Sequence, residues 1–243
     1  MTESASGVSG PLPGFRGRRG RRGPRRLRRL RWWHLLVPAV VVLVLVRSLL
    51  VQTFSVPTGS MQETIAPGDR VLVSRLVRGG DVHRGDVVVF DGRHAFLGEG
   101  DGGPAARLGR AVVGALTLDS GTDYVKRVVG LPGDRVTCCT TSGQAGRLAV
   151  NGVPVTEPYL FPGDAPSDVT FDVVVPPGAI WVMGDHRSAS ADSRSYLGQP
   201  GGGMVDLGDV VGQVTVRYWP LGRLGSLGGP GPLSTVPAPG AGP

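Results

Sequence analysis

The sequence predicts a mainly β protein: an antiparallel β domain preceded by one N-terminal transmembrane helix. Three observations lead to this fold class. Glycine and proline account for 40 and 21 of the 243 residues, which disfavours helical bundles and coiled coils because both residues interrupt regular structure. Short valine-rich runs bounded by Gly, Pro and Asp recur through the body of the chain, and such runs are typical of strands. A single long apolar run lies near the N-terminus.

Residues 1–31 form an arginine-rich tail that we expect to be disordered. Ten arginines lie between Arg16 and Arg31, and branched apolar residues are almost absent, so the tail cannot bury enough surface to offset the entropy of ordering. This run carries the net charge of +7, because the chain from Trp32 onward has 16 basic and 18 acidic residues. Since no aromatic platform accompanies the arginines, we predict contact with anionic lipid of a bilayer and no nucleic-acid partner.

Residues 32–51 are predicted to form an uncleaved membrane anchor. The uninterrupted apolar run, residues 35–46, has only 12 residues, which is near the length of a signal-peptide core. The whole segment has 20 residues, about 30 Å of helix, if Arg47 extends toward the interface. No small-residue cleavage pattern follows, which argues against a cleavable signal peptide, and a buried core helix would not need the preceding arginines. The positive charge predicts a cytoplasmic N-terminus and an extracytoplasmic body in the cell membrane.

Residues 52–222 are expected to form the extracytoplasmic β domain. Gly-Asp pairs precede several of the valine-rich runs and predict tight turns, because Gly supplies positive φ and Asp a short acceptor. Short connections favour antiparallel pairing over βαβ units. The predicted strands are Arg70–Arg75, Asp86–Phe90, Tyr124–Val129, Arg135–Thr137, Leu148–Asn151, Val169–Val175, Ile180–Met183 and Val210–Tyr218.

Two segments are expected to lack regular structure. Residues 92–123 form a long insertion that we interpret as a surface loop, with a helix at 108–118 as the alternative. Residues 223–243 are rich in Gly, Pro and Ser and predict a disordered tail.

The cysteines and histidines offer no metal site. Cys138 and Cys139 are adjacent, so they are either free thiols or a strained vicinal disulfide. The four histidines are scattered and no pair has the spacing of metal ligands. The sequence therefore predicts no metal and no cofactor.

Lys126 is the only lysine among the 26 basic residues. Arginine stays protonated in proteins, whereas a desolvated lysine can lose its proton near neutral pH. Strand alternation places Lys126 on one face with Tyr124 and Val128, and Arg127 on the other. Burial among apolar neighbours would lower the lysine pKa and make it a candidate base. The alternative is a lysine that simply lies on the surface.

Ser60 is the candidate nucleophile. The chain has no GxSxG motif and no plausible Ser-His-Asp arrangement, so a serine paired with the lysine remains. Pro57 and Gly59 restrict the turn around Ser60, and such a turn can present Oγ while the Ser60 N–H and the Thr58 hydroxyl face one oxyanion.

Four ordered motifs together resemble the type I signal peptidases, the bacterial leader peptidase family. They are PTGSM at 57–61, RGDVVVF at 84–90, YVKRVVGLPGD at 124–134 and MGDHRSASADSR at 183–194. The resemblance implies a signal-peptidase-like β catalytic core with a small β extension. It also implies Ser60 as nucleophile, Lys126 as general base, Thr58 with Ser60 as the oxyanion hole, and Ser190 as the residue that hydrogen-bonds and orients the lysine. The supporting residues it implies are an ion pair of Arg127 with Asp185, the polar residues Asp192 and Arg194 that brace the same region, and Met61, which packs in the site.

The implied function is that of a membrane-bound serine endopeptidase that cleaves N-terminal signal peptides from exported preproteins after small residues. Two positions depart from the usual family motifs: Glu63 stands where proline is usual, and His186 where asparagine is usual. A carboxylate at Glu63, if close to Lys126, would favour the protonated lysine. The alternatives are a membrane-tethered β domain that binds a partner, an inactive homologue, and a self-cleaving Ser-Lys regulator.

Overall fold

The computed structural model describes residues 33–42, 50–77, 81–96, 123–140, 146–228 and 231–239. The chain divides into two units, residues 1–44 and residues 45–243, and each is described by itself. The predicted disordered tail at 1–31, the alternative helix at 108–118 and most of the predicted insertion lie outside the described residues.

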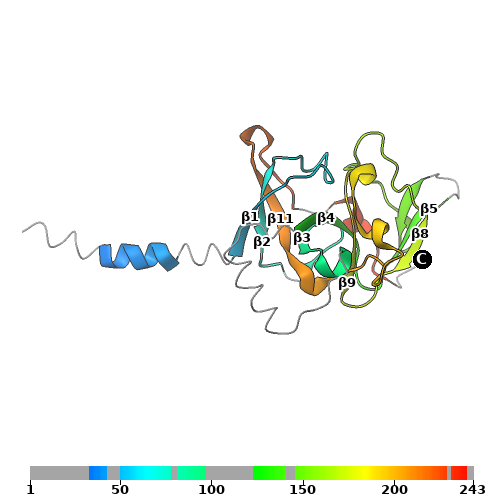
Figure 1. Ribbon diagram of the computed structural model, residues 1–243, viewed down its shortest axis with the longest axis horizontal. Coiled ribbons are helices and arrows are strands. Elements are labelled where there is room, and N and C mark those ends of the chain that lie inside the picture. Colours follow the sequence, from blue (N-terminus) through cyan, green and yellow to red (C-terminus); the bar gives the residue numbers. More distant parts are fainter. Residues whose placement is uncertain are drawn as a thin grey trace, which may run out of the picture. The chain divides into compact units, whose positions relative to one another are not determined.

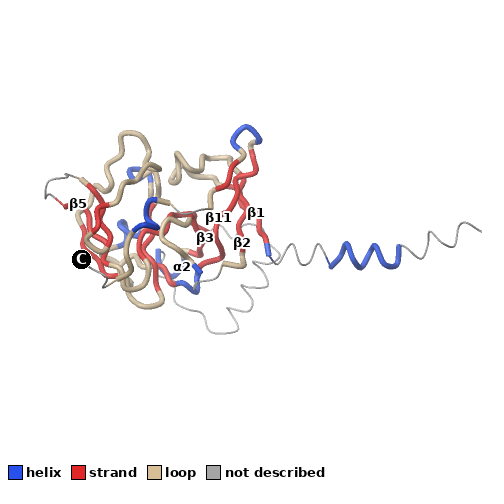
Figure 2. The backbone as a smooth tube through the Cα atoms, turned by 180° about the vertical axis from the view of Figure 1, so that it is seen from behind, coloured by secondary structure: helices blue, strands red, loops and turns tan. Residues whose placement is uncertain are grey.

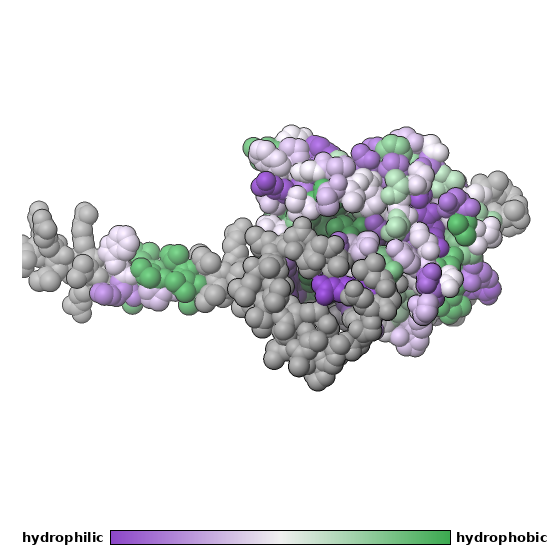
Figure 3. All heavy atoms as spheres, viewed as in Figure 1, coloured by the Kyte–Doolittle hydropathy of each residue, from purple (hydrophilic) through white to green (hydrophobic). Residues whose placement is uncertain are grey.

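The first unit contains a helix over residues 33–42. Most of its side chains are large, apolar and exposed, and the face seen in Figure 3 carries a hydrophobic patch. Among the helices of the described segments, none is long and apolar enough to cross a membrane. Residues 43–49 of the predicted anchor lie outside those segments. The predicted end of the anchor at Val51 is wrong, because Val51 begins a strand and pairs with Ser74.

The larger sheet of the second unit has, within the described residues, eight strands in the order β1-β2-β11-β3-β4-β9-β10, with β12 added beside β11. All of its pairs are antiparallel. Figures 1 and 2 show the β1-β2-β11 end from opposite sides. The strands are β1 (Val51–Ser55), β2 (Arg70–Ser74), β3 (Val87–Asp91), β4 (Asp123–Gly130), β9 (Ala179–Met183), β10 (Val205–Asp206), β11 (Val210–Trp219) and β12 (Gly225–Ser226).

The smaller sheet lies at the other end of the second unit (Figure 1). It comprises β7 (Val153–Pro154), β6 (Arg147–Val150), β5 (Arg135–Thr140) and β8 (Phe171–Val174), paired antiparallel in that order. In β5 a disulfide joins Cys138 and Cys139, with an S–S distance of 2.02 Å. Each of the eight predicted strands overlaps an observed one, so the mainly β, antiparallel fold class is confirmed.

Helices in the described part of the second unit are short. One α-helix, α2 (Arg93–Phe96), follows β3 within the predicted insertion. The 3₁₀ helices are η2 (Arg187–Ala189), η3 (Ser193–Tyr196), η4 (Leu207–Asp209), η5 (Leu221–Arg223) and η6 (Pro232–Thr235).

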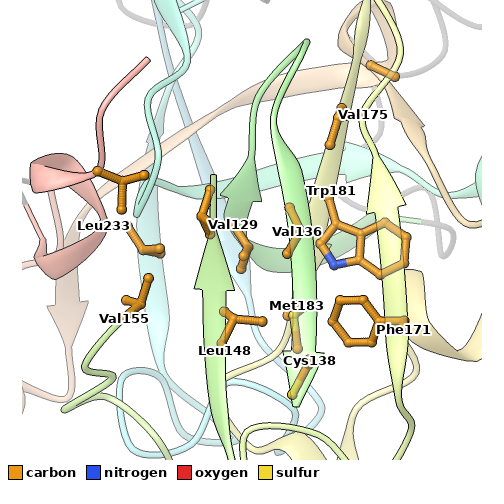
Figure 4. Packing of buried hydrophobic residues seen from close by; sticks show 13 residues of the cluster. Val129, Val136, Cys138, Leu148, Val155, Phe171, Val175, Trp181, Met183 and Leu233 are labelled. Atoms are coloured by element: carbon orange, nitrogen blue, oxygen red, sulfur yellow. The ribbon is translucent and has the colours of Figure 1, made fainter. Parts of the chain in front are cut away.

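The C-terminal segment is folded, which corrects the prediction of a disordered tail over 223–243 for residues 223–228 and 231–239. Leu233, from η6, is fully buried in the hydrophobic cluster between the smaller sheet and β9 (Figure 4). Val236 belongs to the same cluster and is 5% exposed. The Val236 carbonyl accepts a hydrogen bond from Arg84 at 3.0 Å, and the Pro237 carbonyl accepts one from Asn151 at 3.0 Å. Two apolar residues in a Gly/Pro-rich context give no periodic signal, yet their burial offsets the entropy of ordering this segment.

Candidate active site

Ser60 lies in a turn that follows β1 and is anchored by apolar side chains. The Met61 and Ile65 side chains are fully buried in a hydrophobic cluster with residues of β1, β2, β3 and β11. The Gln62 N–H donates to the Gly59 carbonyl at 3.1 Å, and the Ile65 N–H donates to the Met61 carbonyl at 2.7 Å. Packing and backbone hydrogen bonds therefore hold the turn in one place, and the predicted supporting residue Met61 is one of its anchors.

Lys126 extends from β4, the strand between β3 and β9, where it pairs with Val88. Only 3% of Lys126 and 7% of Ser60 are exposed. The Lys126 Nζ donates to the Ser60 Oγ at 2.6 Å, across 66 residues of sequence. The fold therefore brings together the two residues that were predicted to form the nucleophile and base.

Burial lowers the pKa of Lys126 from its ordinary 10.5 to about 8. Desolvation of the ammonium is the largest cause; Asp192 and Asp185 oppose it, and Arg194 adds to it. At this pKa about a tenth of the lysine is neutral at pH 7, so the amine can accept a proton near physiological pH. Glu63 is exposed and is not among the charges that shift the pKa of Lys126. Its carboxylate therefore does not favour the protonated lysine.

Arg127 points away from Lys126 and forms the predicted ion pair with Asp185. Its Nε donates to Asp185 Oδ1 at 2.8 Å and its Nη2 to Asp185 Oδ2 at 2.6 Å, which is the bidentate geometry that orients a guanidinium best. Its Nη1 donates to the Gly85 carbonyl at 2.8 Å. Thr64 donates to the same carboxylate, and the Tyr159 ring lies 4.0 Å from the Arg127 Cζ. This pair ties β4 to the loop after β9.

Asp192 and Arg194 brace the same loop, as predicted. Arg194 donates to both oxygens of Asp192 at 2.9 Å, and the Gly184 N–H donates to Asp192 at 2.9 Å. A Cβ on Gly184 would lie 2.6 Å from the Ser60 carbonyl oxygen and would also meet Ser190. Gly184 therefore permits the close approach of the loop to the Ser60 turn.

Ser190 takes a position that differs from its expected role, whereas Thr58 lies beside the Ser60 turn. The Ser190 Oγ is buried and has no hydrogen-bond partner among the described residues, so it does not orient Lys126 in this structure. Ser190 instead lies against Gly184, close to the Ser60 backbone. Thr58 is exposed beside the turn, two residues before Ser60.

Sequence reasoning missed several residues that build the site. Glu157 and Arg187 form a buried ion pair, and Arg187 also donates to the Gly184 carbonyl at 2.8 Å. The Tyr159 hydroxyl donates to Glu157 at 3.0 Å. Gly184 and Arg187 had a signal, because both lie in the motif at 183–194 that also contains Asp185. Thr64, Glu157 and Tyr159 lie outside the four motifs and had none. In the described part of the chain, no group of three His, Cys, Asp or Glu residues could hold a metal ion.

Comparison with known proteins places the chain in one family. Residues 29–219 match the family "Signal peptidase, peptidase S26". A signal peptidase I of Mycobacterium tuberculosis is 33% identical over 217 residues, covering 79% of this chain and 72% of the relative. A signal peptidase I of Bacillus caldolyticus is 34% identical over 196 residues, covering 75% of this chain and 87% of the relative. With most of its length matched, the chain belongs to the signal peptidase family, peptidase S26, and is a serine endopeptidase.

Proposed function

We propose that this protein removes N-terminal signal peptides from exported preproteins with a Ser60-Lys126 dyad. The observation that carries the proposal is the 2.6 Å contact between the buried Lys126 Nζ and Ser60 Oγ. A buried amine with a pKa of about 8 is suited to take a proton from a hydroxyl. The names of the relatives, signal peptidase I, supply the substrate class.

The mechanism follows from this contact. Neutral Lys126 accepts the proton of the Ser60 hydroxyl while Oγ attacks the scissile carbonyl carbon. The Ser60 N–H and the Thr58 hydroxyl stabilise the oxyanion of the tetrahedral intermediate. Protonated Lys126 then gives its proton to the leaving amine, and water hydrolyses the acyl-enzyme by the same steps in reverse. The buried ion pairs around Asp185 and Asp192 hold the lysine strand and the loop beside it in place.

Substrate selection in this proposal rests on small residues before the cut, typically Ala-x-Ala. In the sequence, a candidate membrane anchor precedes the catalytic domain. The helix over 33–42 exposes its apolar side chains, and ten arginines precede it in the sequence. We propose that this segment tethers the protein to the cytoplasmic membrane with its N-terminus inside, so that the site meets preproteins at the outer surface. Contact of the arginines with anionic lipid would reinforce that orientation.

The tether has its own test. Protease added to intact spheroplasts should digest the domain at 52–222 and leave a fragment that contains the arginine-rich tail. Protection of the whole domain would refute the proposed orientation. Recovery of the full chain in the soluble fraction after membranes are washed with carbonate would refute the tether.

The dyad is tested by cleavage of a preprotein in detergent micelles, with the cut site read by sequencing of the new N-terminus. Ser60→Ala and Lys126→Arg should abolish the cut, because one lacks the nucleophile and the other cannot become neutral. Ser55→Ala is the matched control, since Ser55 is exposed on β1. Covalent labelling by a serine-acylating inhibitor should be lost only in Ser60→Ala. If both dyad variants cut as fast as the parent, the assignment is wrong. A parent that binds the preprotein without cutting it would favour the binding domain or inactive homologue.

A further inference from the structure

His186 contacts the Ser60 turn twice, once with its backbone and once with its side chain. The His186 N–H donates to the Ser60 carbonyl at 3.1 Å. The His186 Nδ1 lies 3.3 Å from the Gly59 carbonyl oxygen. The two carbonyls belong to the peptide bonds on either side of Ser60, so one residue of the loop after β9 holds both.

The side-chain contact requires that the His186 ring carry a hydrogen on Nδ1. A carbonyl oxygen can only accept a hydrogen bond, so the His186 Nδ1 must carry the hydrogen and donate it to Gly59. The ring is held for this contact by Phe161, whose ring stacks on it with centroids 3.9 Å apart and planes at 15°. The Phe161 N–H in turn donates to the Asp185 carbonyl at 3.1 Å. The donor is therefore fixed by packing and not free to rotate away.

The Gly59 carbonyl and the Ser60 N–H belong to the same trans peptide unit. A peptide unit is planar, so a partner that fixes the direction of its C=O also fixes the direction of its N–H. The Gly59 oxygen already accepts from the Gln62 N–H at 3.1 Å, and the imidazole supplies a second donor. Hydrogen bonds to the oxygen polarise the peptide and strengthen its N–H as a donor.

We infer that His186 is a positioning residue for the oxyanion hole: its imidazole holds the Gly59-Ser60 peptide so that the Ser60 N–H faces the oxyanion. This inference rests on the proposed function, in which that N–H stabilises the tetrahedral intermediate. In this inference the imidazole acts through the peptide and not on the substrate itself. Its contribution is needed in the transition state, when negative charge develops on the substrate oxygen.

Three substitutions at His186 separate the effect of the hydrogen-bond donor from the effect of the ring that stacks on Phe161. His186→Phe keeps an aromatic ring to stack on Phe161 and removes the donor. His186→Asn removes the ring and places an amide N–H where Nδ1 stands. His186→Gln also offers an amide, but one atom farther along the side chain. All three keep the backbone N–H that binds the Ser60 carbonyl. His83→Phe is the matched control, because the His83 side chain is 79% exposed and lies outside the site.

Steady-state cleavage of a preprotein by the full chain in detergent micelles gives kcat and KM for each variant. Loss of one neutral hydrogen bond predicts that His186→Phe lowers kcat about 3- to 10-fold and leaves KM unchanged. His186→Asn should recover most of the kcat, and His186→Gln should recover less. The acid limb of the pH profile should keep its midpoint near the Lys126 pKa of about 8 in every variant. The thermal midpoint of His186→Phe should fall by no more than about 2 to 4 °C, the effect of losing one hydrogen bond.

Three results would overturn the inference: a parental kcat in His186→Phe, a raised KM with unchanged kcat, or an equal loss in His186→Asn and His186→Phe. Ser60→Ala is measured beside them. If the parent itself does not cleave, the proposed function fails before His186 is tested. If the parent cleaves, Ser60→Ala does not, and His186→Phe is as fast as the parent, only the inference about His186 fails.

Discussion

Replacing Lys126 with methionine should stabilise the protein at neutral pH while it removes the proposed base. Lys126 is 3% exposed, and its pKa falls from 10.5 to about 8 because burial penalises the ammonium. One pH unit corresponds to about 1.4 kcal/mol, so keeping this lysine protonated in the folded protein costs about 3 kcal/mol. Methionine has a similar length and carries no charge, so it avoids that cost.

The size of the gain depends on pH in a defined way. The unfolded lysine binds its proton more tightly than the folded one, so the cost is complete below pH 8 and disappears as the pH rises through 10.5. The cost is about 3 kcal/mol at pH 7, about 2 at pH 9 and about 1 at pH 10. Methionine also loses the hydrogen bond to Ser60, which subtracts about 1 kcal/mol. Lys126→Met should therefore gain about 2 kcal/mol at pH 7 and about nothing at pH 10.

Urea unfolding of the full chain in detergent micelles, followed by circular dichroism at pH 7, 9 and 10, measures this difference. Arg135→Met is the control, because the Arg135 side chain is 64% exposed on β5 and an exposed ion pair contributes little. A Lys126→Met protein that is no more stable than the parent at pH 7 would refute the reasoning. So would a stability difference that stays constant from pH 7 to pH 10, because the cost would then not come from the buried charge.

Three further outcomes are expected. The rate constant kcat/KM for preprotein cleavage should rise about tenfold per pH unit below pH 8 and level off above it. The reason is that only neutral Lys126, with its pKa of about 8, accepts the Ser60 proton. A flat profile between pH 6 and 9 would exclude lysine as the base. Gly184→Ala should lower kcat about 100-fold, since the new Cβ would lie 2.6 Å from the Ser60 carbonyl oxygen and displace the turn. A kcat equal to that of the parent would show that the loop accommodates the methyl group without moving Ser60. Leu233→Ala should lower the free energy of unfolding by about 2 to 5 kcal/mol, because Leu233 is fully buried. Leu221→Ala, at a side chain that is 71% exposed, should have little effect, and equal stability of the two variants would show that the C-terminal segment does not pack as described.

Site residues could be predicted from the sequence where the reaction requires a particular side-chain chemistry. Only a residue that can lose a proton near neutral pH could serve as the base, and the chain has a single lysine. The Ser60 turn and an Arg127-Asp185 ion pair were predicted from the motifs around them, and the structure shows that the pair is bidentate. The hydrogen bond of Ser190 to Lys126 was also implied by the motifs, but the structure leaves the Ser190 Oγ without a partner. The motifs indicate which residues come together in the fold, but not which of their atoms form hydrogen bonds.

The sequence by itself predicted eight of the strands, because valine-rich runs bounded by turn residues are a local signal. The strands β1, β7, β10 and β12 were not predicted. The sequence also determined the candidate nucleophile and base. Only the tertiary structure decided that a Gly/Pro-rich C-terminal segment is folded, since the gain comes from Leu233 filling a space that distant strands create. It likewise decided the pKa of Lys126 and the hydrogen bonds of His186 to the Ser60 turn. Both depend on desolvation and distances between residues more than 60 positions apart, which no local pattern encodes.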